Sequence, residues 1–267
     1  NPFRPLLSVI MNNRDHRKIF VVDGAVGFTG GINLADEYIN RKERFGYWKD
    51  TAVMIKGDAV QSLTMLFLQM WNVSELKKEK FEPYLTTMAK ELKPETGFVL
   101  PYGDSPYDHE NVGEEVYVHI MTPYLILDNG MLDTLTRAAK SGIEVCIIMP
   151  HIPDKWYAFA VAKTYYRELI EAGVNIYEFT PGFVHAKVFV SDDDTATVGT
   201  VNLDYRSLYL HFECGIFVYD NPVVHKIEKD FQETLKKSCK VTASDIGNTG
   251  IFMRICGRVL RLIAPLM

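Results

Sequence analysis

Residues 16–38 read HRKIFVVDGAVGFTGGINLADEY, and residues 185–207 read HAKVFVSDDDTATVGTVNLDYRS. The second stretch repeats the first without a gap, at an offset of 169 residues (185 minus 16). The identical positions of the first stretch are His16, Lys18, Phe20, Val21, Asp23, Gly30, Asn33 and Leu34. A single repeat at such a long offset indicates a duplicated domain and excludes a solenoid of short repeats.

Both copies begin with a His-x-Lys triplet that continues into apolar, β-branched residues. This pattern predicts a buried strand, a short turn and a second strand. Because side chains alternate across a strand, each histidine shares a face with the lysine of its triplet.

Helical and strand-like patterns alternate along the rest of the chain. Apolar spacing predicts a helix over 61–72, with Leu63, Leu66, Phe67, Met70 and Trp71 packed on a sheet. The later elements are a helix over 131–142 closed by Gly142, a buried strand over 143–150 and a helix over 158–172 stopped by Gly173. This alternation predicts an α/β sheet with helical cover.

Composition excludes several classes of protein. With 267 residues, 47% of them hydrophobic, the chain can bury one large core or two modest ones, which excludes a disordered protein. The net charge of -5 argues against a dedicated nucleic-acid binder. The four cysteines form no CxxC pair, so neither a zinc ribbon nor a disulfide framework is indicated. No apolar run reaches the length of a membrane span.

The pattern HxKxxxxD occurs once in each copy, and an asparagine follows each at the same distance. Two matched occurrences are far too rare to arise by chance in a chain of this length. The motif residues are His16, Lys18, Asp23, His185, Lys187 and Asp192, and the asparagines are Asn33 and Asn202. Through these motifs, and through GGINLADEY, GYWKDTAV, TPYLILD and HFECGIFVYD, the sequence resembles the phospholipase D superfamily and its bacterial cardiolipin synthases.

The resemblance implies an α/β fold of two duplicated α-β-α domains, with the first domain truncated and the active site at the interface. The predicted segments are the C-terminal part of domain one over 1–75, a charged linker over 76–95, domain two over 96–240 and a basic amphipathic tail over 241–267. The chain begins without methionine and reaches the motif by His16, so we expect a fragment. The resemblance places the intact protein in a bacterial cell membrane, with its anchors in the missing amino-terminal region.

The same resemblance implies phosphatidyl transfer between two phosphatidylglycerol molecules, giving cardiolipin and glycerol. A phosphodiester is negatively charged and repels nucleophiles, so its site must supply a nucleophile and fixed cations. One neutral imidazole forms a phosphohistidine while the other exchanges protons with the alcohols, and the two motifs leave open which is which. Neither a metal nor another cofactor is required. The expected partners are phosphatidylglycerol and an anionic membrane surface, without nucleic acid.

Further roles follow from the resemblance. Lys18, Lys187, Asn33 and Asn202 would donate hydrogen bonds to the phosphate oxygens, although both asparagines also suit a turn. Glu213, and with less support Asp50, would accept a hydrogen bond from an imidazole and orient it. Asp23 and Asp192 belong to the motif but suit a bracing role better than a chemical one. The remaining histidines, which lack a repeated partner, are assigned no role: His109, His119, His151, His211 and His225.

Two alternative functions use the same evidence. The motif residues could hydrolyse a phosphodiester, as in a phospholipase D or a nuclease, or the chain could be an inactive membrane-associated remnant. The tail also has two interpretations, because Arg254, Arg258 and Arg261 form a basic stripe on an apolar helix. Such a helix docks on its own domain or lies in an anionic membrane surface.

Overall fold

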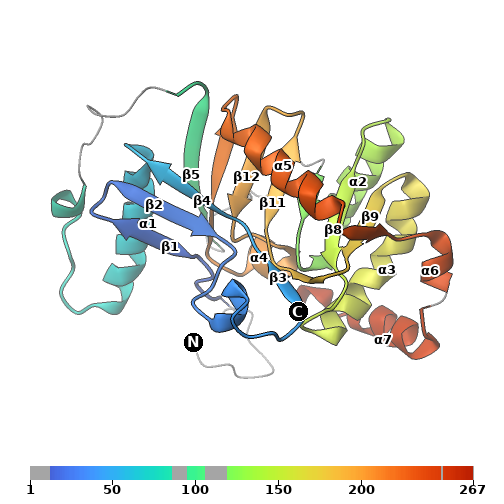
Figure 1. Cartoon of the computed structure of the whole chain (residues 1–267). Helices are drawn as coiled ribbons and strands as arrows, with labels where there is room; N and C mark the ends of the chain where they lie inside the picture. The colour runs from blue at the N-terminus through green and yellow to red at the C-terminus, as the bar shows by residue number, and fades with distance from the viewer. Residues whose placement is uncertain (1–12, 86–94, 106–118, 248, 267) are drawn as a thin grey trace.

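The computed structural model describes residues 13–85, 95–105, 119–247 and 249–266. Its largest sheet combines strands β5 (Phe98–Asp104), β6 (His119–Met121), β8 (Cys146–Pro150), β9 (Asn175–Phe179), β11 (Val188–Ser191), β12 (Thr195–Gly199), β14 (Glu213–Tyr219) and β15 (Ser238–Lys240). Their order is β15-β9-β8-β6-β11-β12-β14-β5, and the sheet lies at the centre of the molecule (Figure 1). The pairs β6-β8 and β8-β9 are parallel and the other pairs are antiparallel, so the predicted α/β class is confirmed.

Helices cover both faces of this sheet. Helices α2 (Asn129–Lys140) and α3 (Trp156–Ala172) pack on one face, and α5 (Val223–Leu235) packs on the other. Neighbouring residues of one strand enter opposite cores, as Ile147 faces α2 and α3 while Ile148 faces α5. The predicted helices and strand of this region are confirmed, and Gly173 ends α3 in the left-handed conformation that favours glycine.

The first copy of the repeat forms a smaller antiparallel sheet. It contains β1 (Ile19–Val22), β2 (Val26–Gly30) and β4 (Ala52–Lys56), and α1 (Ala59–Ser74) packs against it and against β5. The hairpin β1-β2 pairs Ile19 with Thr29, and β11-β12 pairs the equivalent Val188 with Val198. The duplication seen in the sequence is therefore a duplication of structure in the same register.

The buried face of α1 differs from the predicted one. Leu63 is fully buried as expected, but Phe67 and Trp71 are half exposed and stack on each other. Polar Thr64 takes a buried place because its hydroxyl donates to the Val60 carbonyl at 3.1 Å. That hydrogen bond satisfies the buried hydroxyl group, and the buried residues of α1 are Val60, Leu63, Thr64 and Leu68.

The two copies are joined by backbone pairing and by a common core. Strand β3 (Tyr47–Lys49) of the first copy runs parallel to β10 (Gly182–Val184) of the second, whereas β7 (Leu125–Ile126) and β13 (Leu203–Asp204) pair within the second half of the chain. Ile55 and Leu63 of the first copy lie in the same hydrophobic cluster as Val184 of the second. The segment boundaries proposed from the sequence stay a prediction.

Short elements complete the described chain. They are η2 (Asp36–Ile39), η3 (Glu82–Tyr84), α4 (Tyr205–Tyr209), α6 (Ala243–Gly247), α7 (Ile251–Arg261) and η5 (Ala264–Leu266). Among the residues described, no helix combines the length and the apolar composition needed to cross a bilayer.

Candidate active site

Both motif histidines sit where a strand hairpin begins, and each is held by backbone from the other copy. The amide of His185, just before β11, donates to the carbonyl of Lys49 at 2.7 Å. The amide of His16, just before β1, donates to the carbonyl of Phe212 at 3.0 Å. The next residue after Lys49 is Asp50, and the next after Phe212 is Glu213, so each histidine meets an acid from the other copy.

The two acids orient the two imidazoles across the copies. Nδ1 of His185 lies 2.9 Å from Oδ2 of Asp50, and Nδ1 of His16 lies 2.9 Å and 3.0 Å from the carboxylate oxygens of Glu213. Because an ionised carboxylate only accepts, each Nδ1 carries the proton and each neutral ring keeps the Nε2 lone pair. The structure thus brings together the two histidines and the two acids that the sequence proposed. Each acid orients the histidine of the other copy, and not the histidine that precedes it in its own copy.

Buried carboxylates of this kind stay ionised because of their partners. Burial alone would raise the pKa of Glu213, but the charge and hydrogen bond of His16 and the hydroxyl of Thr200 lower it to about 2. Burial likewise opposes ionisation of Asp50, and the hydrogen bond and charge of His185 lower its pKa below the ordinary value. Two fixed negative charges therefore stand behind the imidazoles.

Burial favours the neutral form of both imidazoles. Burial, followed by the charge of Lys187, lowers the pKa of His185 to about 3. Burial also lowers the pKa of His16, although Glu213 opposes that shift. The side chain of His16 is 25% exposed and that of His185 is 8% exposed, so His16 is the more accessible ring.

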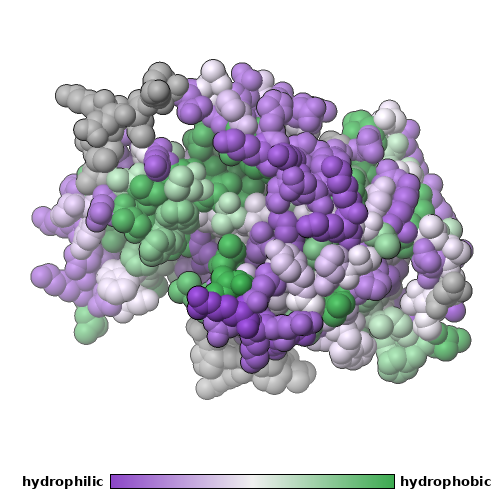
Figure 2. Space-filling model, in the orientation of Figure 1, coloured by the Kyte–Doolittle hydropathy of each residue, from purple (hydrophilic) through white to green (hydrophobic). Residues whose placement is uncertain are grey.

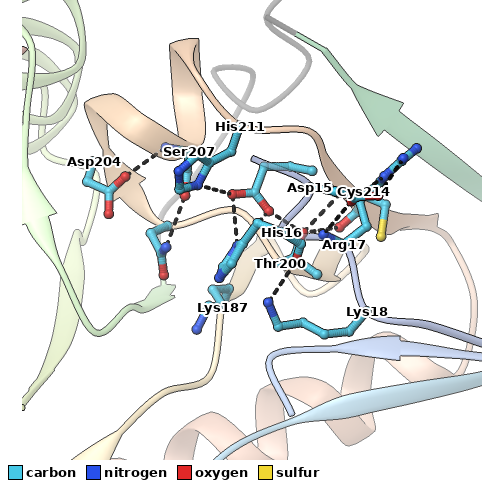
Figure 3. A network of polar contacts seen from close by, with 12 residues as sticks. Asp15, His16, Arg17, Lys18, Lys187, Thr200, Asp204, Ser207, His211 and Cys214 are labelled. Atoms are coloured by element: carbon cyan, nitrogen blue, oxygen red, sulfur yellow. Dashed lines mark hydrogen bonds and ion pairs between the residues drawn. The ribbon is translucent and has the colours of Figure 1, made fainter. Parts of the chain in front are cut away.

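The two lysines place cationic groups beside these rings. Nζ of Lys18 donates to the His16 carbonyl at 2.6 Å, and Nζ of Lys187 donates to the His185 carbonyl at 2.5 Å. Both amino groups lie to one side of the His16 imidazole (Figure 3). Burial lowers the pKa of Lys187 to about 7 and lowers that of Lys18 in the same direction. Such desolvated amines gain most by binding an anion.

The two asparagines are supported by hydroxyl groups at one repeat position. Nδ2 of Asn33 donates to Oη of Tyr38 at 2.6 Å, and Nδ2 of Asn202 donates to Oγ of Ser207 at 2.9 Å. Each amide has a second N–H in addition to the one used here. Donation of that N–H to a phosphate stays a prediction.

The motif aspartates lie away from the histidines. Asp23 and Asp192 occupy the turns of their hairpins, both with a φ of 52° and with exposed side chains. Asparagine and aspartate tolerate this left-handed conformation better than most residues. The structure does not bring the two aspartates into the cluster, and their position fits the bracing of a turn.

The copies differ at one supporting position. Thr200 donates its hydroxyl to the Glu213 carboxylate and accepts from the Cys214 amide at 3.0 Å. Its repeat equivalent is Gly31, where a Cβ would lie 2.2 Å from Oδ1 of Asp50 and 2.7 Å from the His185 carbonyl. The carboxylate of Asp50 occupies the space that a side chain would need.

The substitution Gly31→Ala tests this packing. Its methyl group would displace Asp50 from His185, so we expect activity to fall by at least about tenfold while the fold persists. Gly130→Ala is the matched control, because a Cβ there meets Oδ1 of Asp128 at an ordinary 3.4 Å. Steady-state rates with circular dichroism spectra test this, and equal rates for the two variants would contradict the packing argument.

His211 belongs to the site although the sequence analysis assigned it no role. Its ring centroid lies 5.5 Å from that of His16, and its Nδ1 lies 3.6 Å from Oε1 of Glu213. In Figure 3 the side chains of His16, His211 and Thr200 approach a common place, which is the carboxylate of Glu213. The available signal was its position two residues before Glu213, which places both side chains on one side of an extended segment.

His16, His211 and Glu213 also form a possible metal-ligand group, with one ligand atom from each within 4.8 Å of the others. Glu213 already accepts hydrogen bonds from His16 and Thr200, so an ion would have to displace these partners. The expectation that no metal is required stays a prediction.

Two other histidines pair with acids outside the site. Nδ1 of His119 lies 3.0 Å from Glu228, and Nδ1 of His151 lies 3.1 Å from Glu178. His109 lies outside the described residues. These pairs supply matched controls for experiments on the active-site histidines.

Acid should destabilise the fold through His185. The unfolded chain takes up this proton near the ordinary pKa of 6.5, whereas the folded ring resists until about 3. The free energy of unfolding should therefore fall on acidification through this window, by up to about 1.4 kcal/mol per pH unit. His185→Asn should flatten the slope in urea denaturation at several pH values.

His119 supplies the opposite control. Its hydrogen bond to Glu228 raises its pKa, so its contribution is present in acid and is lost as pH rises through the folded pKa. His119→Asn should lower the free energy of unfolding by a constant amount below pH 6.5 and leave the slope between pH 6.5 and about 3 unchanged. If His185→Asn leaves the slope unchanged, the ring is not held neutral in the fold.

Comparisons with known proteins identify related sequences and a related fold. Residues 114–235 match the family described as cardiolipin synthase, PLD-like domain. The chain is 37% identical over 272 residues to cardiolipin synthase 2 of Bacillus cereus, covering 98% of this chain and 53% of that protein. It is 55% identical over 277 residues to an uncharacterized protein of Streptococcus mutans, covering 100% of this chain and 60% of that protein. The chain thus spans little more than half the length of these relatives.

A solved structure supports the fold. The phosphatidylserine synthase of Haemophilus influenzae superposes with a TM-score of 0.71 over 97% of this chain and 71% of that one, at 14% sequence identity. The repeated motif, the matched family and this superposition agree with one another. The chain belongs to the phospholipase D superfamily and carries a phospholipase D-like domain of the cardiolipin synthase type.

Proposed function

We propose that this chain forms the catalytic site of a phosphatidyltransferase that converts two phosphatidylglycerol molecules into cardiolipin and glycerol. The observation that carries the proposal is the reciprocal pairing of His16 with Glu213 and of His185 with Asp50. It supplies two oriented imidazoles of the same tautomer, one for attack on phosphorus and one for proton transfer.

The reaction is a double displacement. Nε2 of one imidazole attacks the phosphorus of phosphatidylglycerol, a P–N bond forms, and the P–O bond to glycerol breaks. The other imidazole, protonated in the substrate complex, gives its proton to the departing glycerol oxygen. It then takes a proton from the hydroxyl of a second phosphatidylglycerol, whose oxygen attacks phosphorus as the P–N bond breaks. Either His16 or His185 can be the nucleophile in this scheme.

Substrate binding prepares the proton donor. Burial lowers the pKa of both rings, and a phosphodiester anion raises the pKa of nearby cationic groups. Lys18 and Lys187 would contact the nonbridging oxygens, where charge increases in the transition state. The second N–H groups of Asn33 and Asn202 would support the same oxygens.

The site of action follows from the substrate. We propose a bacterial cell membrane as the location, with phosphatidylglycerol and the anionic bilayer surface as partners and without nucleic acid. Membrane anchors would belong to parts of the protein other than this chain.

Lipid mass spectrometry tests the reaction. Phosphatidylglycerol vesicles are incubated with membranes that contain the complete protein, and cardiolipin and glycerol are expected in equal amounts. Phosphatidic acid instead of cardiolipin would show that water is the acceptor and that the protein is a phospholipase D. No lipid product would favour an inactive remnant or a nuclease.

A further inference from the structure

The helix α7 is attached to the domain along one side only. Its Gly257 lies against α3 so closely that a Cβ there would lie 2.3 Å from the Ala160 carbonyl oxygen. The guanidinium of Arg261 lies over the Tyr165 ring at 3.9 Å and approaches Glu168 at 3.9 Å. These contacts fix which side of α7 faces the protein and which side faces outward.

The outward side of α7 is apolar. Its residues are between 57% and 83% exposed, and they are Ile251, Phe252, Ile255, Val259 and Leu262. With 3.6 residues per turn, they fall within an arc of about 100° centred opposite Gly257. The apolar surface at the lower right of Figure 2 coincides with α7 in Figure 1. An apolar stripe normally faces a core, whereas this one faces away from it.

Positive charge borders this apolar face. Arg254 and Arg258 are exposed between the outward stripe and α3, and residues 250–267 contain three arginines and no acid. The whole chain carries a net charge of -5, so this segment is positively charged although the chain as a whole is negatively charged. Arg261 differs from the sequence-based interpretation, because its place over Tyr165 anchors the helix to the domain.

We propose that the outward face of α7 docks in the interface of an anionic lipid bilayer. The apolar side chains enter the acyl region, and Arg254 and Arg258 bind lipid phosphates at its border. A second copy of the chain fits less well, because two such faces would bring arginines together without an acid on either helix. The docked and membrane-facing interpretations of the tail therefore describe two sides of one helix.

The position of α7 suits an enzyme that takes lipid from a surface. In the view of Figure 1, α7 lies at the lower right of the molecule and the short blue helix η2 lies at the lower left of centre. The segment that leads into η2 carries Asn33 of the candidate site and the fully exposed Leu34. Binding of this lower side to a bilayer would bring the candidate site close to lipid headgroups.

Fluorescence tests the location of the face. Phe252→Trp adds a tryptophan to the outward stripe, and its emission in the 267-residue chain should shift to shorter wavelength on vesicles of phosphatidylglycerol and phosphatidylcholine. Brominated acyl chains should quench this added emission relative to the parent chain. An added emission that neither shifts nor is quenched would overturn the proposal.

Co-sedimentation provides a matched comparison. Phe252→Ser/Val259→Ser should weaken binding to these vesicles by at least about tenfold, because two apolar side chains no longer leave water. Phe98→Ser/Val73→Ser, at residues 70% and 73% exposed elsewhere, should bind like the parent chain. Arg254→Gln/Arg258→Gln should reduce the salt dependence of binding. Equal losses in the two serine variants would contradict a specific role of α7.

Further controls separate the possible outcomes. Circular dichroism and melting of each variant verify that the fold is retained, since all four replaced apolar side chains are exposed. Unchanged vesicle binding together with a loss of dimer in light scattering would overturn the proposal in favour of a second copy. Vesicle binding requires no turnover, so the proposal and the transferase reaction fail independently.

Discussion

Replacing either His16 or His185 by asparagine is expected to lower phosphatidyl transfer by at least about a thousandfold. Asparagine keeps an N–H close to the position of Nδ1, so the buried acid retains a donor, but it has no Nε2 to attack phosphorus or move a proton. Cardiolipin formed from phosphatidylglycerol vesicles gives the rate. His119→Asn is the matched control, because His119 also pairs with a carboxylate but lies on β6 outside the site.

The same variants identify the nucleophile. With phosphatidyl p-nitrophenol the leaving group needs no proton, so a variant that keeps the nucleophilic ring should still release p-nitrophenol and retain the phosphatidyl group. Peptide mapping of the adduct then assigns the phosphohistidine to His16 or His185. Full activity in either asparagine variant would refute the two-histidine mechanism.

Glu213→Gln should lower the rate by roughly 10² to 10⁴, and Asp50→Asn should have a comparable effect. An amide can still accept one hydrogen bond, but it no longer stabilises an imidazolium or enforces the tautomer with Nδ1 protonated. The loss should appear mainly in kcat, since the acids lie behind the imidazoles.

Nuclear magnetic resonance of the histidine rings tests this pairing across the copies directly. With ¹⁵N-labelled histidine, Glu213→Gln should shift the ring signals of His16 and leave those of His185 close to the parent values. Asp50→Asn should do the reverse. If each acid instead perturbed the histidine of its own copy, the structural pairing would be wrong.

The repeat in the sequence predicted the two strand hairpins of the structure. Its gap-free register predicted two equivalent hairpins, and the pairs Ile19 with Thr29 and Val188 with Val198 confirm them. Gly173 predicted the end of α3 because few other residues adopt that backbone conformation. These features depend on neighbouring residues, which is why local sequence was sufficient to predict them.

The exchange of acids between copies could not be predicted in this way. Glu213 follows His185 along the chain, yet its carboxylate contacts His16, because the segment before it lies beside the other copy. The requirement for glycine at position 31 could not be predicted either, because the Asp50 carboxylate occupies the space that a side chain there would need. His211 was missed because no repeated partner marked it. All three depend on packing between distant segments.

Exchange of the acids also makes both imidazoles depend on contact between the two copies. A copy that folds alone holds its histidine without the carboxylate that orients it, and holds its carboxylate without a histidine. Docking of the two copies completes both pairs together. An imidazole oriented by a carboxylate is therefore present only while the two copies are in contact.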